Sequence, residues 1–230
     1  MKERPILFSA PMVRAILDGR KTQTRRVIKP QPRHDLFEVC NFHKSCVDRN
    51  GNLYPSIKEY FGICDIDGDW SVKCPFGTVG DRLWVRETAK ATATEEGIDC
   101  IQYMADDHCR QIMVSEYGPW RKMRSYSCGH ARAVPSIHMP RWASRINLEV
   151  AGIRVERLNE ISPKDAIAEG CMPSSGSGLG TPENFREAAR LVGGPYPRGI
   201  FAMLWESING PGSWAANPWV WVVEFRRVEQ

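Results

Sequence analysis

The closing run PWVWVVEFRRVE constrains the fold of this chain more than any other stretch. From Trp219 to Val223 it contains no polar residue, and its β-branched and aromatic side chains favour an extended strand. A strand this apolar needs cover on both faces, so the pattern predicts a central strand. About five separated strand patterns and few helical ones accompany it, which predicts an α+β fold: a small mixed β-barrel with helices packed on it.

The N-terminal segment has the local pattern of a strand, a capped helix and a second strand. Residues 6–8 predict a strand, Ser9 can cap a following helix, and Pro11 falls in the first turn, where a missing N–H costs nothing. Gly19 predicts the end of that helix. The segment KTQTRRVI (residues 21–28) then favours a second strand because of its threonines and closing Val-Ile pair.

Further elements follow from alternating and helical patterns. Apolar and polar residues alternate at 83–86 and 146–155, which predicts two strands, the second with a bulge or bend at Gly152. Ser162, with an acid three residues later, predicts a helix start. A helix with one apolar stripe is expected at 201–208, ended by an Asn-Gly-Pro sequence.

The length of 230 residues predicts a single domain, residues 1–230, interrupted by insertions. The insertions are expected at about 29–76, 90–135 and 171–199, where periodicity is weak or mixed. The first and third are rich in residues that favour turns and loops. Within the third, residues 182–191 predict one helix.

Positive charge is concentrated near the start of the chain. The formal net charge is only +4, but nine Lys or Arg precede Asp35, against two acids, Glu3 and Asp18. A basic segment suits a phosphate-bearing or otherwise anionic ligand. It is equally consistent with a solvated cationic surface.

The sequence predicts a cytoplasmic protein without membrane association. The N-terminus lacks the apolar run of a signal peptide, and no segment approaches the roughly 20 apolar residues of a membrane span. The eight cysteines are therefore expected to be reduced thiols. No CxxC pair occurs. A zinc site is one alternative, but its spacing matches no familiar pattern, so we expect no metal; the residues it would use are Cys40, His43, Cys46, Cys64 and Cys74.

Several segments together resemble the ASCH family, a branch of the PUA-like superfamily. They are ILDGRKTQTRR, GDRLWVRET, RINLEVAGIRVERLNEIS followed by AIAEG, and a closing WVVEF. The longer segments FSAPMVRAILDGRKTQTRR, PSIHMPRWASRI and SWAANPWVWVVEFRRVE resemble the long form of this family found in bacteriophages and prophages. The likeness covers the core and both termini but not the insertions. It implies a pseudo-barrel with flanking helices, close to RNA-binding PUA domains.

The resemblance also implies an activity. Some small ASCH proteins are amidohydrolases that remove the acetyl group from N4-acetylcytidine, using a lysine, a threonine and a glutamate. Their GRKTxTxR motif corresponds here to Lys21, Thr24 and Arg26. The family's glutamate follows the third strand, which points to Glu169, although Glu160 is nearby.

The chemistry of such a site is consistent with these residue types. A threonine hydroxyl is a poor nucleophile until a base removes its proton, and a lysine is that base only when its amine is uncharged. Partial burial and repulsion from Arg20, Arg25 and Arg26 would both favour an uncharged Lys21. A glutamate at a helix end suits a proton carrier, and such assistance is worth about 10²–10⁴-fold in rate. Thr24 is equally consistent with an ordinary strand threonine.

Further residues are candidates for contacting the substrate. An indole of Trp84 or Trp142 could stack on a base, and Glu87 could accept a hydrogen bond from the edge of that base. Both tryptophans are also consistent with core positions. His138, in IHMPRW, could reach the mouth of a pocket, although a packed histidine is the simpler interpretation. The candidate substrate-binding set is Arg25, Arg26, Trp84, Arg86, Glu87, Arg141 and Trp142.

Two functions of different classes remain open at this point. The first is a metal-independent amidohydrolase, without a cofactor, that acts on N4-acylated cytidine or a related modified nucleoside. The second is a binding module for modified or single-stranded RNA or DNA, whose affinity would weaken steeply with salt. A nuclease ranks lower because the sequence shows no carboxylate cluster for metal-assisted cleavage. The sequence predicts no oligomeric state.

Overall fold

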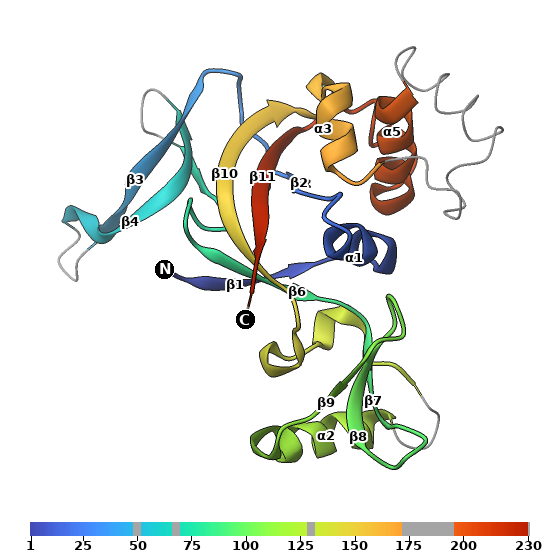
Figure 1. The fold of residues 1–230 in the computed structure, drawn as a ribbon. Helices are drawn as coiled ribbons and strands as arrows, with labels where there is room; N and C mark the ends of the chain where they lie inside the picture. The colour runs from blue at the N-terminus through green and yellow to red at the C-terminus, as the bar shows by residue number, and fades with distance from the viewer. Residues whose placement is uncertain (48–51, 66–69, 128–131, 172–195, 230) are drawn as a thin grey trace. The chain divides into compact units, whose positions relative to one another are not determined.

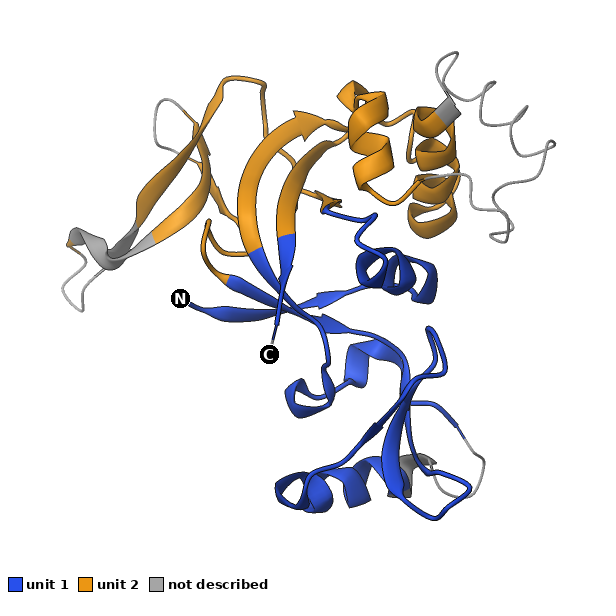
Figure 2. Ribbon diagram, viewed as in Figure 1, with its two compact units in different colours: residues 1–22, 82–149, 226–230 blue, residues 23–81, 150–225 orange. Residues whose placement is uncertain are grey.

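A computed structural model describes residues 1–47, 52–65, 70–127, 132–171 and 196–229 (Figure 1). In these residues the chain is a mixed α+β protein with several sheets and few helices, as the sequence predicts. The expected small barrel is not seen as a closed sheet in the described strands, since each of their sheets has two edge strands. By its internal contacts the chain divides into two compact units (Figure 2).

The largest sheet contains five strands in the order β1-β6-β10-β11-β2. β1 and β6 are parallel, whereas β10 pairs antiparallel with β6, and β11 pairs antiparallel with β2. β10 and β11 are long neighbouring strands (Figure 1). The bounds of the five strands are β1 Glu3–Leu7, β2 Gln23–Val27, β6 Arg82–Arg86, β10 Asn147–Arg157 and β11 Trp219–Val228.

Unit 1 consists of residues 1–22, 82–149 and 226–230 (blue in Figure 2). Besides β1, β6 and the start of β10, it holds an antiparallel sheet of order β7-β8-β9. Tyr103 and Trp120 are almost fully buried in its core, and the Trp120 Nε1 donates a hydrogen bond to the Cys100 carbonyl at 3.0 Å. The other elements are α1 Ala10–Leu17, β7 Ala89–Ala93, β8 Asp99–Tyr103, β9 Cys109–Gln111, η1 Val114–Glu116, α2 Tyr117–Ser127, η2 Ser136–His138 and η3 Arg141–Ala143.

Unit 2 consists of residues 23–81 and 150–225 (orange in Figure 2). It holds β2, most of β10 and β11, and a second antiparallel sheet of order β3-β4-β5. Phe201, Trp205 and Trp214 fill a core against the buried valines of β11. The other elements are β3 Phe37–Val47, β4 Leu53–Asp65, β5 Ser71–Lys73, η4 Leu158–Glu160, α3 Pro163–Ala168 and α5 Tyr196–Asn209.

The N-terminal prediction is confirmed except in one detail. α1 begins after Ser9 with a proline in its first turn, and Gly19 follows its end with φ +72°, a conformation that glycine adopts at little cost. Ser9 occupies the N-cap position, but its side chain makes no capping hydrogen bond. In the second predicted cap, by contrast, the Asp165 N–H donates to the Ser162 Oγ at 3.0 Å.

Gly152 lies within β10, which is one continuous and curved strand (Figure 1). An added Cβ would lie 2.9 Å from the Glu224 Oε2, closer than ordinary van der Waals contact. The glycine therefore makes room for a side chain of β11. The predicted bulge or bend at this position stays a prediction.

The segment expected as an unpatterned insertion at 29–76 contains regular structure. β3 and β4 form a long antiparallel pair, and β5 extends it. A Cβ at Gly62 would overlap the Val72 carbonyl oxygen, so this close approach of two strands requires glycine. Weak alternation hid these strands from sequence reasoning.

The last helix is longer than predicted. α5 buries Phe201 and Trp205 as expected, but Ile208 at the end of the predicted stripe is 54% exposed. The predicted helix at 182–191 lies outside the described residues. No helix in the described ranges is long and apolar enough to cross a membrane.

Candidate functional site

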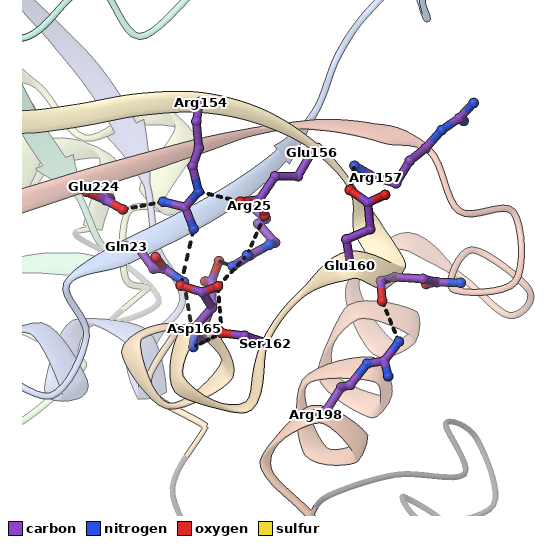
Figure 3. Close-up of polar contacts among 12 residues, drawn as sticks. Gln23, Arg25, Arg154, Glu156, Arg157, Glu160, Ser162, Asp165, Arg198 and Glu224 are labelled. Atoms are coloured by element: carbon purple, nitrogen blue, oxygen red, sulfur yellow. Dashed lines mark hydrogen bonds and ion pairs between the residues drawn. The ribbon is translucent and has the colours of Figure 1, made fainter. Parts of the chain in front are cut away.

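Arg25 in β2 lies at the centre of an acidic cluster in unit 2 (Figure 3). Its side chain is fully buried. One Nη donates to the Glu156 Oε2 at 2.9 Å and lies 3.5 Å from an Asp165 carboxylate oxygen, and the other donates to the Glu169 Oε1 at 3.4 Å. Buried charges are stable only when they are paired, so these carboxylates fix the position of the guanidinium.

A second arginine, Arg154 of β10, shares two of these carboxylates, Glu156 and Asp165 (Figure 3). It forms ion pairs with Glu156 and Glu224, and it donates to the Asp165 Oδ1 at 3.2 Å. Two guanidinium groups therefore meet four carboxylates, counting Glu169. The cluster carries a formal excess of negative charge.

Helix α3 positions two of the acids. The Ser162 Oγ donates to the Asp165 Oδ2 at 2.8 Å, and Gln23 of β2 donates to the Asp165 carbonyl at 2.9 Å. Burial alone would raise the pKa of Asp165. The hydrogen bond from Ser162 and the charges of Arg25 and Arg154 more than offset it, so the pKa is lowered.

Glu169 occupies the C-cap of α3 and is 4% exposed. Its backbone N–H donates to the Asp165 carbonyl at 2.8 Å, and Gly170 follows with φ +89°. Glu169 also interacts electrostatically with Arg26: burial lowers the pKa of Arg26, and the glutamate charge partly opposes this. The carboxylate predicted from AIAEG therefore interacts with two of the three arginines of the basic run, Arg25 and Arg26.

Lys21 and Thr24 are also buried, at 2% and 3% exposure. The Lys21 backbone N–H donates to the Ala15 carbonyl at 2.9 Å, and its Nζ lies 5.6 Å from the centroid of the Phe8 ring, within the range of a cation–π contact. Thr24 lies in β2, opposite Val223 of β11. Lys21 belongs to unit 1, whereas Thr24 and Glu169 belong to unit 2.

The basic run is not a crowd of uncompensated cations. Arg20 forms an ion pair with Asp18 at 2.7 Å, and Arg25 is surrounded by the three carboxylates described above. Nearby carboxylates therefore offset the charges of Arg20 and Arg25, which the expected repulsion on Lys21 treats as uncompensated. The effect on Lys21 itself stays a prediction.

Arg86 and Arg141 both lie against the Trp84 ring in unit 1. The Arg86 and Arg141 guanidinium carbons lie 5.0 Å and 5.9 Å from the centroid of the Trp84 ring. Arg86 also donates to the Met139 carbonyl at 3.0 Å, and Arg141 forms an ion pair with Glu3 at 2.9 Å. The indole predicted to stack on a base thus has two arginines of the chain itself against it.

Glu87 is the most enclosed of the predicted binding residues, at 1% exposure. Both of its oxygens accept hydrogen bonds from Arg145, at 2.8 Å and 2.9 Å. Arg145 also donates to both oxygens of Asp106, and its guanidinium lies 4.0 Å from the centroid of the Tyr103 ring. The glutamate predicted to contact a base edge instead belongs to an internal network of the unit.

The remaining two predictions near this region concern Trp142 and His138. Both line a pocket within unit 1. His138 is exposed, so the simpler interpretation as a packed histidine is wrong.

The cysteines do not form a metal site in the described residues. Cys40 and Cys64 form a disulfide between β3 and β4, which corrects the expectation of eight reduced thiols. The antiparallel pairing of the two strands brings these residues together. Burial and the neighbouring Cys109 raise the pKa of the Cys100 thiol to about 11, so it is protonated and a poor nucleophile at neutral pH. In the described ranges no group of three or more His, Cys, Asp or Glu could hold a metal ion.

Of the cluster around Arg25, sequence reasoning predicted Glu169 but missed the roles of Glu156, Asp165 and Arg154. Arg154 and Glu156 alternate along one strand, so their placement on one face could have been found. Asp165 was recognised only as part of a helix start. Its pairing with Arg25 spans two distant segments and has no local signal.

No protein-family model, no curated protein and no solved structure matches this chain.

Proposed function

We propose that the chain is an ASCH-type, PUA-like amidohydrolase that removes an acyl group from N4-acylated cytidine or a related modified nucleoside. Thr24 is the nucleophile, Lys21 its base and Glu169 the proton carrier. One observation supports this best: three polar side chains selected by the motif alone are each no more than 4% exposed. Lysine and glutamate are rarely buried to this extent without a partner or a function.

The proposed reaction has two stages. The Thr24 oxygen attacks the acyl carbon while its proton passes to the Lys21 amine, and a tetrahedral oxyanion forms. The C–N bond then breaks, the exocyclic nitrogen takes up a proton, and the acyl group remains on Thr24 as an ester. Water hydrolyses the ester, releases the acid and restores the threonine hydroxyl.

Burial is the main support for Lys21 as the base. Lys21 is 2% exposed, and its Nζ lies 5.6 Å from the centroid of the Phe8 ring. Acids compensate the charges of Arg20 and Arg25, so the proposal does not rest on repulsion from these two guanidinium groups.

Glu169 is the proposed proton carrier because it matches the position of the family's glutamate and is buried, at 4% exposure. One of its oxygens accepts a hydrogen bond from Arg25 at 3.4 Å, longer than the distance of about 2.7–2.9 Å usual for a charged hydrogen bond.

The test is turnover of N4-acetylcytidine by the purified chain, followed by mass. Thr24→Ala should reduce turnover at least about 10³-fold, while Thr24→Ser should retain part of it because a hydroxyl is still present. Thr22→Ala is the matched control, since Thr22 is exposed in the same motif and should tolerate the change. Equal turnover by Thr24→Ala and Thr22→Ala would refute the assignment.

A further inference from the structure

A pocket of about 470 Å³ lies within unit 1, between α2 and the segment 134–142. Met123 and Val134 form part of its apolar wall, together with prolines from both segments. Cavities of roughly 300–1,000 Å³ with mostly apolar walls are typical of small-molecule sites. The pocket is built by residues of the second predicted insertion and the loop that follows it.

The apolar wall is fixed by the core of the unit. Met123 and Val134 are 6% and 5% exposed and belong to the buried cluster around Tyr103. Val134 exchanges two backbone hydrogen bonds with Ala89, at 3.2 Å and 2.7 Å. A preformed wall lowers the entropic cost of binding, because few side chains have to be ordered.

The ionisable side chains that line the pocket are basic. Trp142 contributes an aromatic surface, and Lys122 and His138 are the basic side chains of the lining, which includes no acid among the described residues. Lys122 and His138 are exposed, whereas Trp142 is half-buried. A bound molecule would therefore meet the ring and the apolar wall inside the pocket and the basic groups at its rim.

We propose that this pocket binds a small aromatic anion. Its flat ring would stack against Trp142, and its carboxylate or phosphate would lie at the rim, near Lys122 and His138. Stacking supplies binding without requiring a particular ring substituent, and an anion at the rim stays partly hydrated, which limits its desolvation cost. This site uses none of Lys21, Thr24 and Glu169, the residues assigned to the reaction above. Trp142, a candidate for stacking on the nucleoside base, is assigned here to this pocket instead.

The first experiment separates the two features of the ligand. Phenyl phosphate and benzoate are titrated into the full chain by calorimetry, with benzyl alcohol and inorganic phosphate as probes that carry only the ring or only the anion. We expect at least one aromatic anion to bind about tenfold more tightly than either single-feature probe. A preference for phenyl phosphate assigns a phosphate ester, and a preference for benzoate assigns a carboxylic acid.

Two variants then locate the binding site. Lys122→Glu should raise the dissociation constant about tenfold or more, because it places a negative charge at the rim. The matched control is Arg121→Glu, the preceding residue on α2, whose guanidinium lies 5.0 Å from the Tyr117 ring and which does not line the pocket. Trp142→Ala should weaken binding to a similar extent. If Trp142→Ala fails to fold, the comparison of Lys122→Glu with Arg121→Glu still tests whether the pocket binds the anion, because Lys122 is exposed.

Two results would overturn the proposal. One is the absence of saturable binding of both aromatic anions up to ~10 mM. The other is an equal effect of Lys122→Glu and Arg121→Glu, which would indicate attraction to general surface charge. Thr24→Ala should bind the probes as the unmodified chain does, so failure here and failure of the amidohydrolase proposal are distinguishable.

Discussion

Two arginines, a half-buried one in unit 1 and a buried one in unit 2, bind carboxylates in different ways. Arg145 in unit 1 forms two-pronged hydrogen bonds with Glu87 and Asp106, all between 2.8 and 2.9 Å. Arg25 in unit 2 contacts three carboxylates, one oxygen of each, at 2.9, 3.4 and 3.5 Å. Its Nε is buried and has no hydrogen-bond partner in the described residues.

The difference indicates what each network does. Two-pronged contacts at short distance are the strongest and most directional that an arginine makes, so the Arg145 network is suited to hold unit 1 together. Burial would lower the pKa of Arg145, but its hydrogen bonds to Glu87 and Asp106 raise it. Two of the three contacts of Arg25 are longer, and each uses one oxygen of a carboxylate, so they are less directional. Under the proposed function, this second network positions Glu169.

The largest expected effect comes from removing the guanidinium of the tighter network. Arg145→Met leaves the Glu87 carboxylate buried at 1% exposure without its partner. Breaking a buried ion pair in this way costs about 3–5 kcal/mol of unfolding free energy. Urea unfolding of the variant and of the unmodified chain at pH 7 measures this loss of unfolding free energy.

The double variant Arg145→Met/Glu87→Met is the control for that measurement. Removing both charges should restore most of the lost free energy, since no uncompensated carboxylate remains in the core. A double variant as unstable as Arg145→Met would show that packing of the arginine on Tyr103, and not charge, stabilises this part of unit 1.

Replacing Arg25 or Arg145 by lysine should show which of the two networks affects turnover as well as the free energy of unfolding. Arg25→Lys keeps the charge but cannot reach three carboxylates at once, so we expect a loss of about 1–3 kcal/mol in unfolding free energy. Because Glu169 also loses its contact, turnover of N4-acetylcytidine should fall about 10²-fold or more. Arg145→Lys should lose comparable stability with turnover unchanged. Equal turnover by the two variants would contradict the distinction between the networks.

A smaller effect is expected from pH. The pKa of Asp165 and that of Asp106 both lie below the ordinary value of 3.8. Each carboxylate therefore stabilises the fold above about pH 4, and this contribution is lost as pH falls through the lowered pKa. The unfolding free energy should decrease from pH 5 to pH 3, and the slope should be shallower in Asp165→Asn and in Asp106→Asn. An unchanged slope in both variants would show that neither aspartate is coupled to its arginine.

Local signals predicted much of the fold. The strands β2, β6 and β11 and the start of α3 were predicted from alternation, apolar runs and capping residues. Each of these signals lies within a few residues of the element that it predicts. The pairing of β3 with β4 could not be predicted because neither strand alternates clearly. Sequence reasoning does not give the position of one segment against another. For the same reason it could not show that Gly152 makes room for Glu224 of β11.

In the candidate site, too, local signals could be predicted from the sequence, whereas contacts between distant segments could not. Lys21, Thr24 and Glu169 were selected by motif, and their burial is a property that the motif does not encode. The compensation of Arg25 in β2 by three carboxylates depends on acids from β10 and from the segment of α3, which are distant in sequence, so composition alone gave the wrong charge balance. Counting basic residues along the chain overestimates a positive site whenever distant acids fold against it.

The smallest expected effect tests the outer edge of the Arg25 network. In Gly152→Ala the new methyl group would lie 2.9 Å from the Glu224 Oε2 and displace that side chain from Arg154. Because Arg154 and Glu224 are 34% and 48% exposed, we expect a loss of only about 0.2–1 kcal/mol. In Glu224→Gln the ion pair is already absent, so adding Gly152→Ala should cost less there. Urea unfolding of the two single variants and the double variant gives this coupling, and strictly additive losses would show that the methyl group acts on the backbone of β10 and not through Arg154.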